Sequence, residues 1–187
     1  MRQNFNFITI TIVLFFGMIV YSCSNQNTEK YNTININPKN KVWNNGPNFN
    51  ADSAYSFIEK QVSFGPRIPN TANHIACGDW LVKKLNSYQI KTTEQIGEVT
   101  AFNMSKLPLR NISGIINPNA DKKVLLCAHW DTRPFADRDS VNKTKPILGA
   151  NDGASGVGVL LEIARVISKD SLDICVEFIF FDVEDYG

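Results

Sequence analysis

The stretch ASGVGVLLEIARVISKDSLDICVEFIFFD (residues 154–182) decides the fold, because it joins a helix to a buried strand. Its first half is apolar at helical spacing, so one face of the helix is apolar. That face consists of Val157, Leu160, Leu161, Ala164 and Ile167. Its second half, residues 172–182, is dominated by a short apolar run, which predicts a buried strand.

A second apolar run lies upstream, in KKVLLCAHWD (residues 122–131). Residues 124–128 are apolar without interruption, as in a strand covered on both faces. A long polar loop over residues 131–150 then leads to the helix. Strand, loop, helix and strand form a crossover unit, which predicts that the two strands are parallel.

The remaining segments complete an α/β domain. Helical spacing predicts helices over residues 52–65 and 73–89, with Asp52 or Ser53 capping the first and Gly65 ending it. A loosely alternating strand is expected over 89–103. The segment RNISGIIN (110–117) should form another, joined by a Pro-Asn turn to the 122–131 strand. We therefore expect a mixed, largely parallel central sheet flanked by helices.

The N-terminal residues have the layout of an exported lipoprotein. An apolar segment from Phe5 to Tyr21 leads to Ser22 and Cys23, which resemble a lipidation site, although an ordinary signal peptide has a similar layout. We assign residues 1–22 to a lipoprotein signal peptide, 23–50 to an Asn-rich tether and 51–187 to the folded domain. The expected location is the bacterial cell envelope, with the lipid on Cys23 as a membrane anchor.

Charge and cysteine content exclude several classes of protein. Without residues 1–22 the chain has 18 basic and 18 acidic residues, which does not suggest a nucleic-acid partner. Beyond Cys23, the cysteines are not closely spaced, so neither a zinc ribbon nor a disulfide framework is indicated. Cys127 and Cys175 fall in apolar strands, where cysteine commonly serves as a small hydrophobic residue.

Polar side chains follow both strands of the crossover unit and also precede its helix. His129 and Asp131 come after the first strand, and Glu184 and Asp185 after the second, while Asp152 precedes the helix. The crossover brings these three clusters to one edge of the sheet, where sites form in α/β proteins. Each also has an ordinary explanation, namely a core histidine, a helix cap and a solvated turn.

Zinc is the cation that suits these side chains best. Neighbouring carboxylates in a partly buried site repel each other unless a cation intervenes. Asp152 and Asp185 can supply two ligands, which leaves Glu184 free to act as a general acid or base. His129 and Asp131 can be ligands or outer groups, with Asp131 orienting the imidazole.

Three motifs in this region resemble a known family. They are AHWDTRPFAD (128–137), PILGANDGASGVGVLLEIAR (146–165) and FFDVEDYG (180–187). Together they are similar to the zinc aminopeptidase superfamily, and within it to the bacterial, animal-type glutaminyl-peptide cyclotransferases. VSFGPRIPNT (62–71) is similar to the N-terminal part of that family, so the resemblance covers residues 52–187.

The resemblance implies a role for each matched position. Asp152 and Asp185 match zinc ligands, and Glu184 matches the catalytic acid/base. The family's third ligand, a histidine, and a further catalytic aspartate lie downstream, and neither His74 nor His129 stands at that histidine's position. We therefore expect an N-terminal fragment that is inactive in isolation.

The implied reaction converts an N-terminal glutamine of peptides or proteins to pyroglutamate, with release of ammonia and one zinc ion. The alternative is an aminopeptidase with two zinc ions, in which His129 binds the second. Asp182 in FFDVED favours the cyclase. A truncated, inactive relative is the third interpretation. We expect Trp130, Arg133 and Phe135 to pack the 131–150 loop rather than line a substrate pocket.

Overall fold

The computed structural model describes residues 47–186, which belong to one compact unit. The predicted signal peptide, Cys23 and the tether up to residue 46 lie outside the described residues. Within residues 47–186, every helix is too short or too polar to cross a bilayer.

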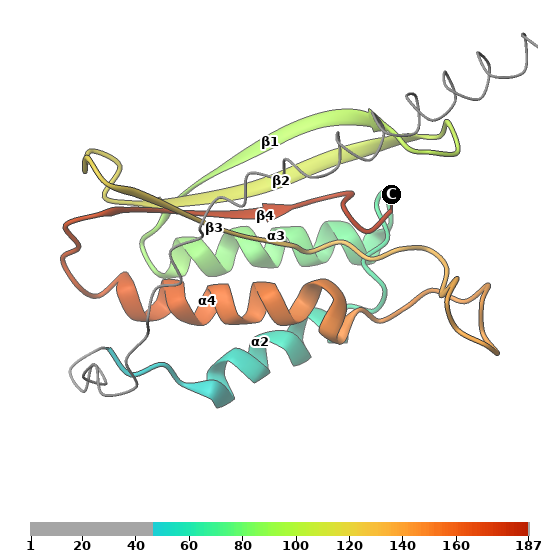
Figure 1. Cartoon of the computed structure of the whole chain (residues 1–187), viewed down its shortest axis with the longest axis horizontal. Helices are drawn as coiled ribbons and strands as arrows, with labels where there is room; N and C mark the ends of the chain where they lie inside the picture. Colours follow the sequence, from blue (N-terminus) through green and yellow to red (C-terminus); the bar gives the residue numbers. More distant parts are fainter. Residues whose placement is uncertain (1–46, 187) are drawn as a thin grey trace, which may run out of the picture. The chain divides into compact units, whose positions relative to one another are not determined.

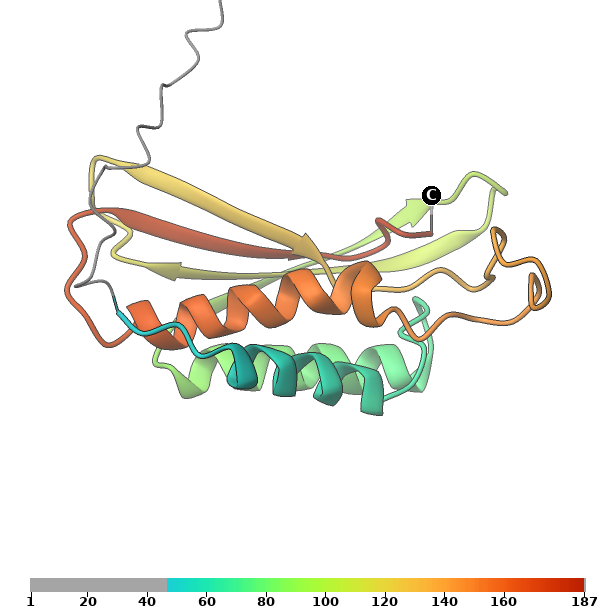
Figure 2. The same cartoon turned by 60° about the horizontal axis from the view of Figure 1, so that its bottom comes forward.

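The described domain has two layers, with all three α-helices on one face of a single sheet (Figures 1 and 2). The helices are α2 (Ala51–Ser63), α3 (Ala72–Ser87) and α4 (Ser155–Ile167). Their apolar faces meet the sheet in one core, where Leu81, Leu161 and Phe178 are completely buried. The predicted helices are therefore confirmed.

The sheet has four strands in the order β1-β2-β4-β3. The strands are β1 (Lys91–Thr100), β2 (Lys106–Ile116), β3 (Lys123–His129) and β4 (Cys175–Phe181). The crossover prediction is confirmed because β3 and β4 are parallel, whereas β4 pairs antiparallel with β2 and β2 antiparallel with β1. The mixed α/β fold is thus confirmed, with less parallel pairing among the described strands than expected.

Strand β4 separates β2 from β3, so the two strands joined by the Pro-Asn turn are not neighbours. Register pairs Ile112 of β2 with Phe180, and Val124 of β3 with Val176. Val176, Phe178 and Phe180 of β4 are all buried. The most apolar strand takes the central position because it gains most from being covered.

The expectation that residues 124–128 are covered on both faces is wrong for the described residues. Val124 and Leu125 are 42% and 54% exposed, and Cys127 is also exposed. Strand β3 is at the edge of the described sheet. Because side chains alternate along a strand, Leu125 and Cys127 project from the face opposite the helices, where no described helix packs.

Helix α2 is capped by Asn50, and not by Asp52 or Ser53 as the sequence suggests. The Asn50 side chain accepts a hydrogen bond from the Ser53 amide at 2.9 Å. The Asn50 amide donates to Glu162 Oε1 of α4 at 2.8 Å. Two bonds from Arg165 lower the pKa of this buried Glu162 carboxyl, despite the opposing effect of burial. The start of α2 is thereby attached to α4.

Candidate active site

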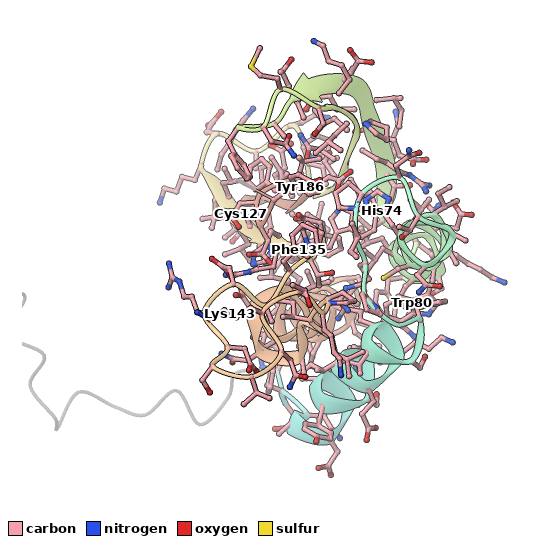
Figure 3. All side chains as sticks on the ribbon, turned by 90° about the vertical axis from the view of Figure 1, so that its right-hand side faces the viewer. His74, Trp80, Cys127, Phe135, Lys143 and Tyr186 are labelled. Carbon is pink, nitrogen blue, oxygen red and sulfur yellow. The ribbon has the colours of Figure 1, made fainter. Side chains whose placement is uncertain are left out.

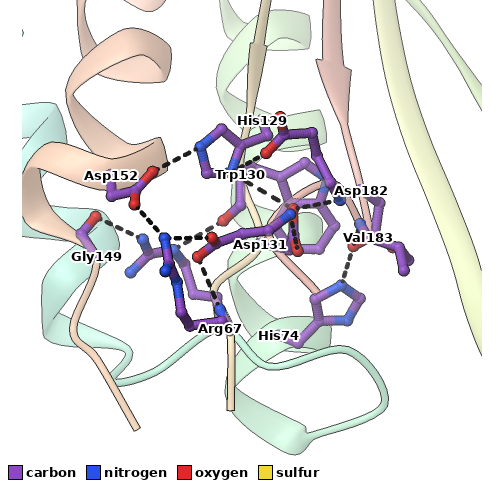
Figure 4. Close-up of polar contacts among 12 residues, drawn as sticks. Arg67, His74, His129, Trp130, Asp131, Gly149, Asp152, Asp182 and Val183 are labelled. Carbon is purple, nitrogen blue, oxygen red and sulfur yellow. Dashed lines mark hydrogen bonds and ion pairs between the residues drawn. The ribbon is translucent and has the colours of Figure 1, made fainter. Parts of the chain in front are cut away.

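The three polar clusters meet at one end of the sheet, as the crossover unit predicts (Figure 4). His129 is the last residue of β3, Asp152 lies in the turn before α4, and Glu184 follows β4. His129 Nε2 lies 3.1 Å from Asp152 Oδ1, and His129 Nδ1 lies 3.7 Å from Glu184 Oε2. These side chains are therefore close enough to act on one substrate or cation.

Asp131 holds the backbone that carries Glu184 and Asp185. Its Oδ1 atom accepts a hydrogen bond from the Glu184 amide, and its Oδ2 atom accepts one from the Asp185 amide, both at 3.2 Å. Asp131 is completely buried. Asp131 therefore fixes the conformation of the turn, and its place relative to a metal ion stays a prediction.

Asp182 is a second buried carboxylate behind the same turn. Its Oδ1 atom lies 2.8 Å from His74 Nε2, and its Oδ2 atom accepts the Arg110 amide at 2.8 Å. The His74 ring stacks on Trp130 with a centroid distance of 4.2 Å. The sequence did not reveal this role of His74. For Asp182, the sequence offered one indication of a role, namely a charged residue directly after the apolar run of β4.

The turn itself is strained at Val183. Its φ angle is +63°, in the left-handed region that a β-branched residue rarely adopts. The Val183 amide donates to Asp182 Oδ1 at 2.9 Å, and the Asp182 amide donates to Asn111 Oδ1 at 2.8 Å. Side-chain oxygens thus accept the amides of all four residues 182–185, and these bonds keep the backbone in this conformation.

Arg67 connects the end of β3 to the loop that carries Asp152 (Figure 4). This buried guanidinium donates to the carbonyls of Trp130, Leu148 and Gly149 at 2.8–2.9 Å. Gly149 has a φ of +59°, and a Cβ there would lie 2.8 Å from Arg67 Nη2, so only glycine suits the position. The segment that contains Arg67 resembles the family in sequence, but the sequence did not reveal that Arg67 binds these three carbonyls.

Asp152 is not a helix cap. It lies in a π-helical turn, η1 (Ala150–Ala154), with φ −88° and ψ 100°, and α4 begins only at Ser155. Its two carboxylate oxygens instead contact His129 Nε2 at 3.1 Å and Arg133 Nη2 at 2.7 Å. The side chain is 47% exposed, so it remains accessible to a ligand.

Arg133 lies between the two predicted zinc ligands. Its Nη2 atom is 2.7 Å from Asp152 Oδ2 and 2.8 Å from Asp185 Oδ1. Its backbone amide donates to Asp185 Oδ2 at 2.9 Å, and Nη1 pairs with Asp137 at 3.2 Å. The bond to Asp185 is the main cause of the raised pKa of this guanidinium. The motif analysis did not anticipate Arg133 in this position.

His129 is surrounded by carboxylates. Asp131 has the largest effect and, with Glu184 and Asp152, raises the pKa of His129 to about 9, against the lowering effect of burial. The nearest Asp131 oxygen lies 3.6 Å from Nδ1, so the pair is ionic and not a close hydrogen bond. At neutral pH the imidazole therefore carries a positive charge and donates through Nε2 to Asp152.

A cavity of about 270 Å³ opens beside Asp185. Its lining includes Phe135 and Tyr186, which are labelled near each other in Figure 3, together with Phe102 and Arg133. Phe135 and Arg133 therefore line a cavity, and the expectation that they pack their own loop rather than line a substrate pocket stays a prediction. Trp130, by contrast, is completely buried in the core.

The two predicted zinc ligands, Asp152 and Asp185, lie on either side of one cationic group. Asp152 and Asp185 direct oxygens at one shared cationic nitrogen, which shows that they can hold a cation together. No group of three or more histidine, cysteine, aspartate or glutamate side chains in residues 47–186 has metal-binding geometry. A catalytic zinc ion commonly has three protein ligands, so these residues fit zinc as two of them.

Comparison with known proteins locates the family resemblance in the second half of the chain. Residues 111–187 match peptidase family M28. This region carries the similarity to the zinc aminopeptidase superfamily. The matched region begins within β2 and includes β3, η1, α4 and β4, so it contains His129, Asp131, Asp152, Asp182, Glu184 and Asp185 but not Arg67, His74, Phe102 or Arg110.

Solved structures that are similar to this chain include glutaminyl cyclases. The glutaminyl cyclase of Bacteroides thetaiotaomicron is 50% identical over 76% of this chain and 50% of its own, with a TM-score of 0.74. The glutaminyl-peptide cyclotransferase of Drosophila melanogaster is 26% identical over 64% of this chain and 33% of its own. Aminopeptidase YwaD of Bacillus subtilis is 37% identical over 42% of this chain and 15% of its own.

The chain therefore spans about half the length of these solved structures, and less of the curated relatives. The family resemblance seen in the sequence motifs is confirmed. The zinc and catalytic roles of Asp152, Glu184 and Asp185 stay predictions, because proximity alone does not establish them.

Proposed function

We propose that this protein converts the N-terminal glutamine of peptides or proteins to pyroglutamate and releases ammonia, with one zinc ion as cofactor. The observation that carries the proposal is the 50% identity to a bacterial glutaminyl cyclase over three quarters of the chain. The site contains groups suited to this chemistry, because a free carboxylate stands beside two convergent ones.

Glu184 is the proposed general acid and base. Among the site carboxylates in residues 47–186, it is the one without a side-chain hydrogen bond, and it is 63% exposed. It takes a proton from the attacking α-amine and delivers it to the leaving nitrogen of the glutamine side chain. Its backbone is held by Asp131, so the carboxylate approaches the substrate from a fixed position.

Asp152 and Asp185 are the proposed zinc ligands. When bound, zinc supplies Lewis-acid polarisation of the glutamine amide carbonyl. Because residues 47–186 provide two ligands with suitable geometry, we propose that they bind zinc weakly without a further ligand and are inactive alone.

An aminopeptidase is the second candidate function. His129 lies 3.1 Å from Asp152 and could bind a second zinc ion if it lost its proton. The similarity to aminopeptidase YwaD also favours this activity. Ammonia release from a peptide with N-terminal glutamine, measured beside hydrolysis of an aminoacyl anilide, separates the two. Anilide cleavage without ammonia would replace the cyclase by the peptidase, and absence of both would favour an inactive relative.

We also propose that the protein is exported and anchored to the cell envelope by a lipid on Cys23. The support is the apolar segment that ends in Ser22 and Cys23. The substitution Cys23→Ala should move the protein to the soluble fraction. Unchanged membrane retention, together with an unchanged mass of the mature N-terminus, would contradict the proposal.

A further inference from the structure

We propose that Arg133 occupies the cation position between Asp152 and Asp185 until a metal ion binds, and that metal binding requires its guanidinium to move away. The inference rests on the proposed function, because the metal concerned is the zinc of that function. It gives Arg133 a positioning role in metal loading.

The first support is the geometry of one nitrogen atom. Arg133 Nη2 lies 2.7 Å from Asp152 Oδ2 and 2.8 Å from Asp185 Oδ1, so it bridges residues from two separate segments. Carboxylates this close repel each other unless a cation lies between them. A metal ion bound by the same two oxygens would have to take the place of that nitrogen.

The second support is that the hydrogen-bond donors of Arg133 are incompletely satisfied, unlike those of Arg67. Arg67 donates through Nε, Nη1 and Nη2 to three carbonyl oxygens. The buried Nε atom of Arg133 has no hydrogen-bond partner among the described residues. A buried donor without a partner is costly. Arg67 is thus built into the scaffold, whereas the placement of Arg133 is easier to reverse.

The third support is the space beside Arg133. Two cavities, of about 270 and 410 Å³, are both lined by Arg133 and Asp137. Asp137 Oδ1 already lies 3.2 Å from Arg133 Nη1, and the Asp137 side chain is 64% exposed. The guanidinium can therefore turn toward Asp137 and retain one carboxylate partner after it leaves the other two.

This arrangement has two consequences for zinc binding. Arg133 keeps the two ligand carboxylates close together in the metal-free protein. Arg133 also competes with the metal. The metal ion must interact with the two carboxylates more favourably than the guanidinium that it displaces. Removal of the guanidinium should therefore strengthen zinc binding, although it also removes the two ion pairs that hold Asp152 and Asp185 together in the metal-free protein.

The test is a zinc titration of the metal-free complete protein in competition with a chromophoric chelator. Arg133→Gln should lower the zinc dissociation constant by roughly 10- to 100-fold, the effect of losing hydrogen bonds to charged groups. Arg138→Gln, which removes one charge from the same loop, is the matched control and should change it by less than about twofold. Equal or weaker zinc binding by Arg133→Gln would overturn the proposal.

A second variant tests the resting place of the displaced guanidinium. Asp137→Asn should weaken zinc binding by roughly 2- to 5-fold, since Asp137 is one of three carboxylate partners of Arg133 in the metal-free protein but its remaining partner once the metal has displaced the guanidinium. An unchanged constant would overturn the assignment to Asp137. Circular dichroism establishes that each variant is folded. Zinc binding by neither the wild type nor Arg133→Gln would overturn both this inference and the proposed zinc function, whereas equal binding contradicts the inference alone.

Discussion

Two histidine–aspartate pairs lie at the same end of the sheet, His74–Asp182 and His129–Asp152. The first has a 2.8 Å contact and side chains that are 4% and 0% exposed. The second has a 3.1 Å contact and side chains that are 18% and 47% exposed. Asp182 also accepts two backbone amides, whereas Asp152 shares its charge with Arg133.

The difference indicates that the two pairs have different roles within one site. Removing one partner of a buried pair leaves an uncompensated polar group, so His74–Asp182 fixes the geometry of the turn. An exposed pair contributes little to stability and can exchange partners, so His129–Asp152 is suited to admitting a cation. The site is thus rigid around the buried pair His74–Asp182 and adaptable around the exposed pair His129–Asp152.

The largest effect, on activity, is expected for Glu184, the exposed carboxylate on the rigid turn. Glu184→Gln keeps the shape but removes proton transfer, so cyclase activity should fall by roughly 10²- to 10⁴-fold. Stability and zinc content should stay unchanged, because the Glu184 side chain is 63% exposed. The checks are ammonia release in the complete enzyme, thermal unfolding and metal analysis. Full activity in this variant would remove Glu184 from the mechanism.

Loss of the buried pair His74–Asp182 should destabilise the protein strongly. Asp182→Ala leaves His74 and the amides of Arg110 and Val183 without their acceptor, which should cost about 3–5 kcal/mol of unfolding free energy. Urea denaturation measures this loss. A cost below about 1 kcal/mol, typical of an exposed pair, would abolish the contrast between the two pairs.

The burial of α3 beside His74 can be tested through Cys77. Burial raises the pKa of this thiol to about 12 from its ordinary value of 9.0, so the folded state keeps the proton at a pH where the unfolded state loses it. Because of Cys77, the free energy of unfolding should therefore fall progressively above pH 9, by up to about 1.4 kcal/mol per pH unit. The measurement is unfolding free energy from pH 8 to 10.5 beside Cys77→Ala. Parallel pH profiles would contradict the burial.

The smallest effect on stability is expected for the exposed pair. Asp152→Asn should change the unfolding free energy by less than about 1 kcal/mol, because its partners are exchangeable. The same substitution should weaken zinc binding, since a neutral amide replaces an anionic ligand. A cost comparable to that of Asp182→Ala would show that both pairs serve the scaffold.

Patterns local in the sequence predicted much of this fold. The apolar periodicity of residues 154–182 and the crossover unit correctly placed α4, β3 and β4, and brought His129, Asp152 and Glu184 to one edge. The position of β4 between β2 and β3 was missed, because a Pro-Asn turn does not determine which strands pair. The exposure of Leu125 depends on that strand order and was missed with it.

The supporting groups of the site escaped prediction for a related reason. Arg67 bonds to the Trp130 carbonyl 63 residues away, and His74 bonds to Asp182 108 residues away. Neither contact has a fixed spacing that a sequence pattern could reveal. Asp131 and Asp152 were named in advance, but their partners, which are backbone amides and Arg133, emerge only from the folded arrangement.

The left-handed backbone at Val183 marks a place where stability and catalytic performance oppose each other. A β-branched residue at a φ of +63° costs on the order of 1–3 kcal/mol, which glycine would largely avoid. Glycine would also widen the range of conformations open to the segment that bears Glu184. Glycine at this position should therefore give a more stable protein in which Glu184, the proposed acid–base group, is held less firmly, so that activity falls as stability rises.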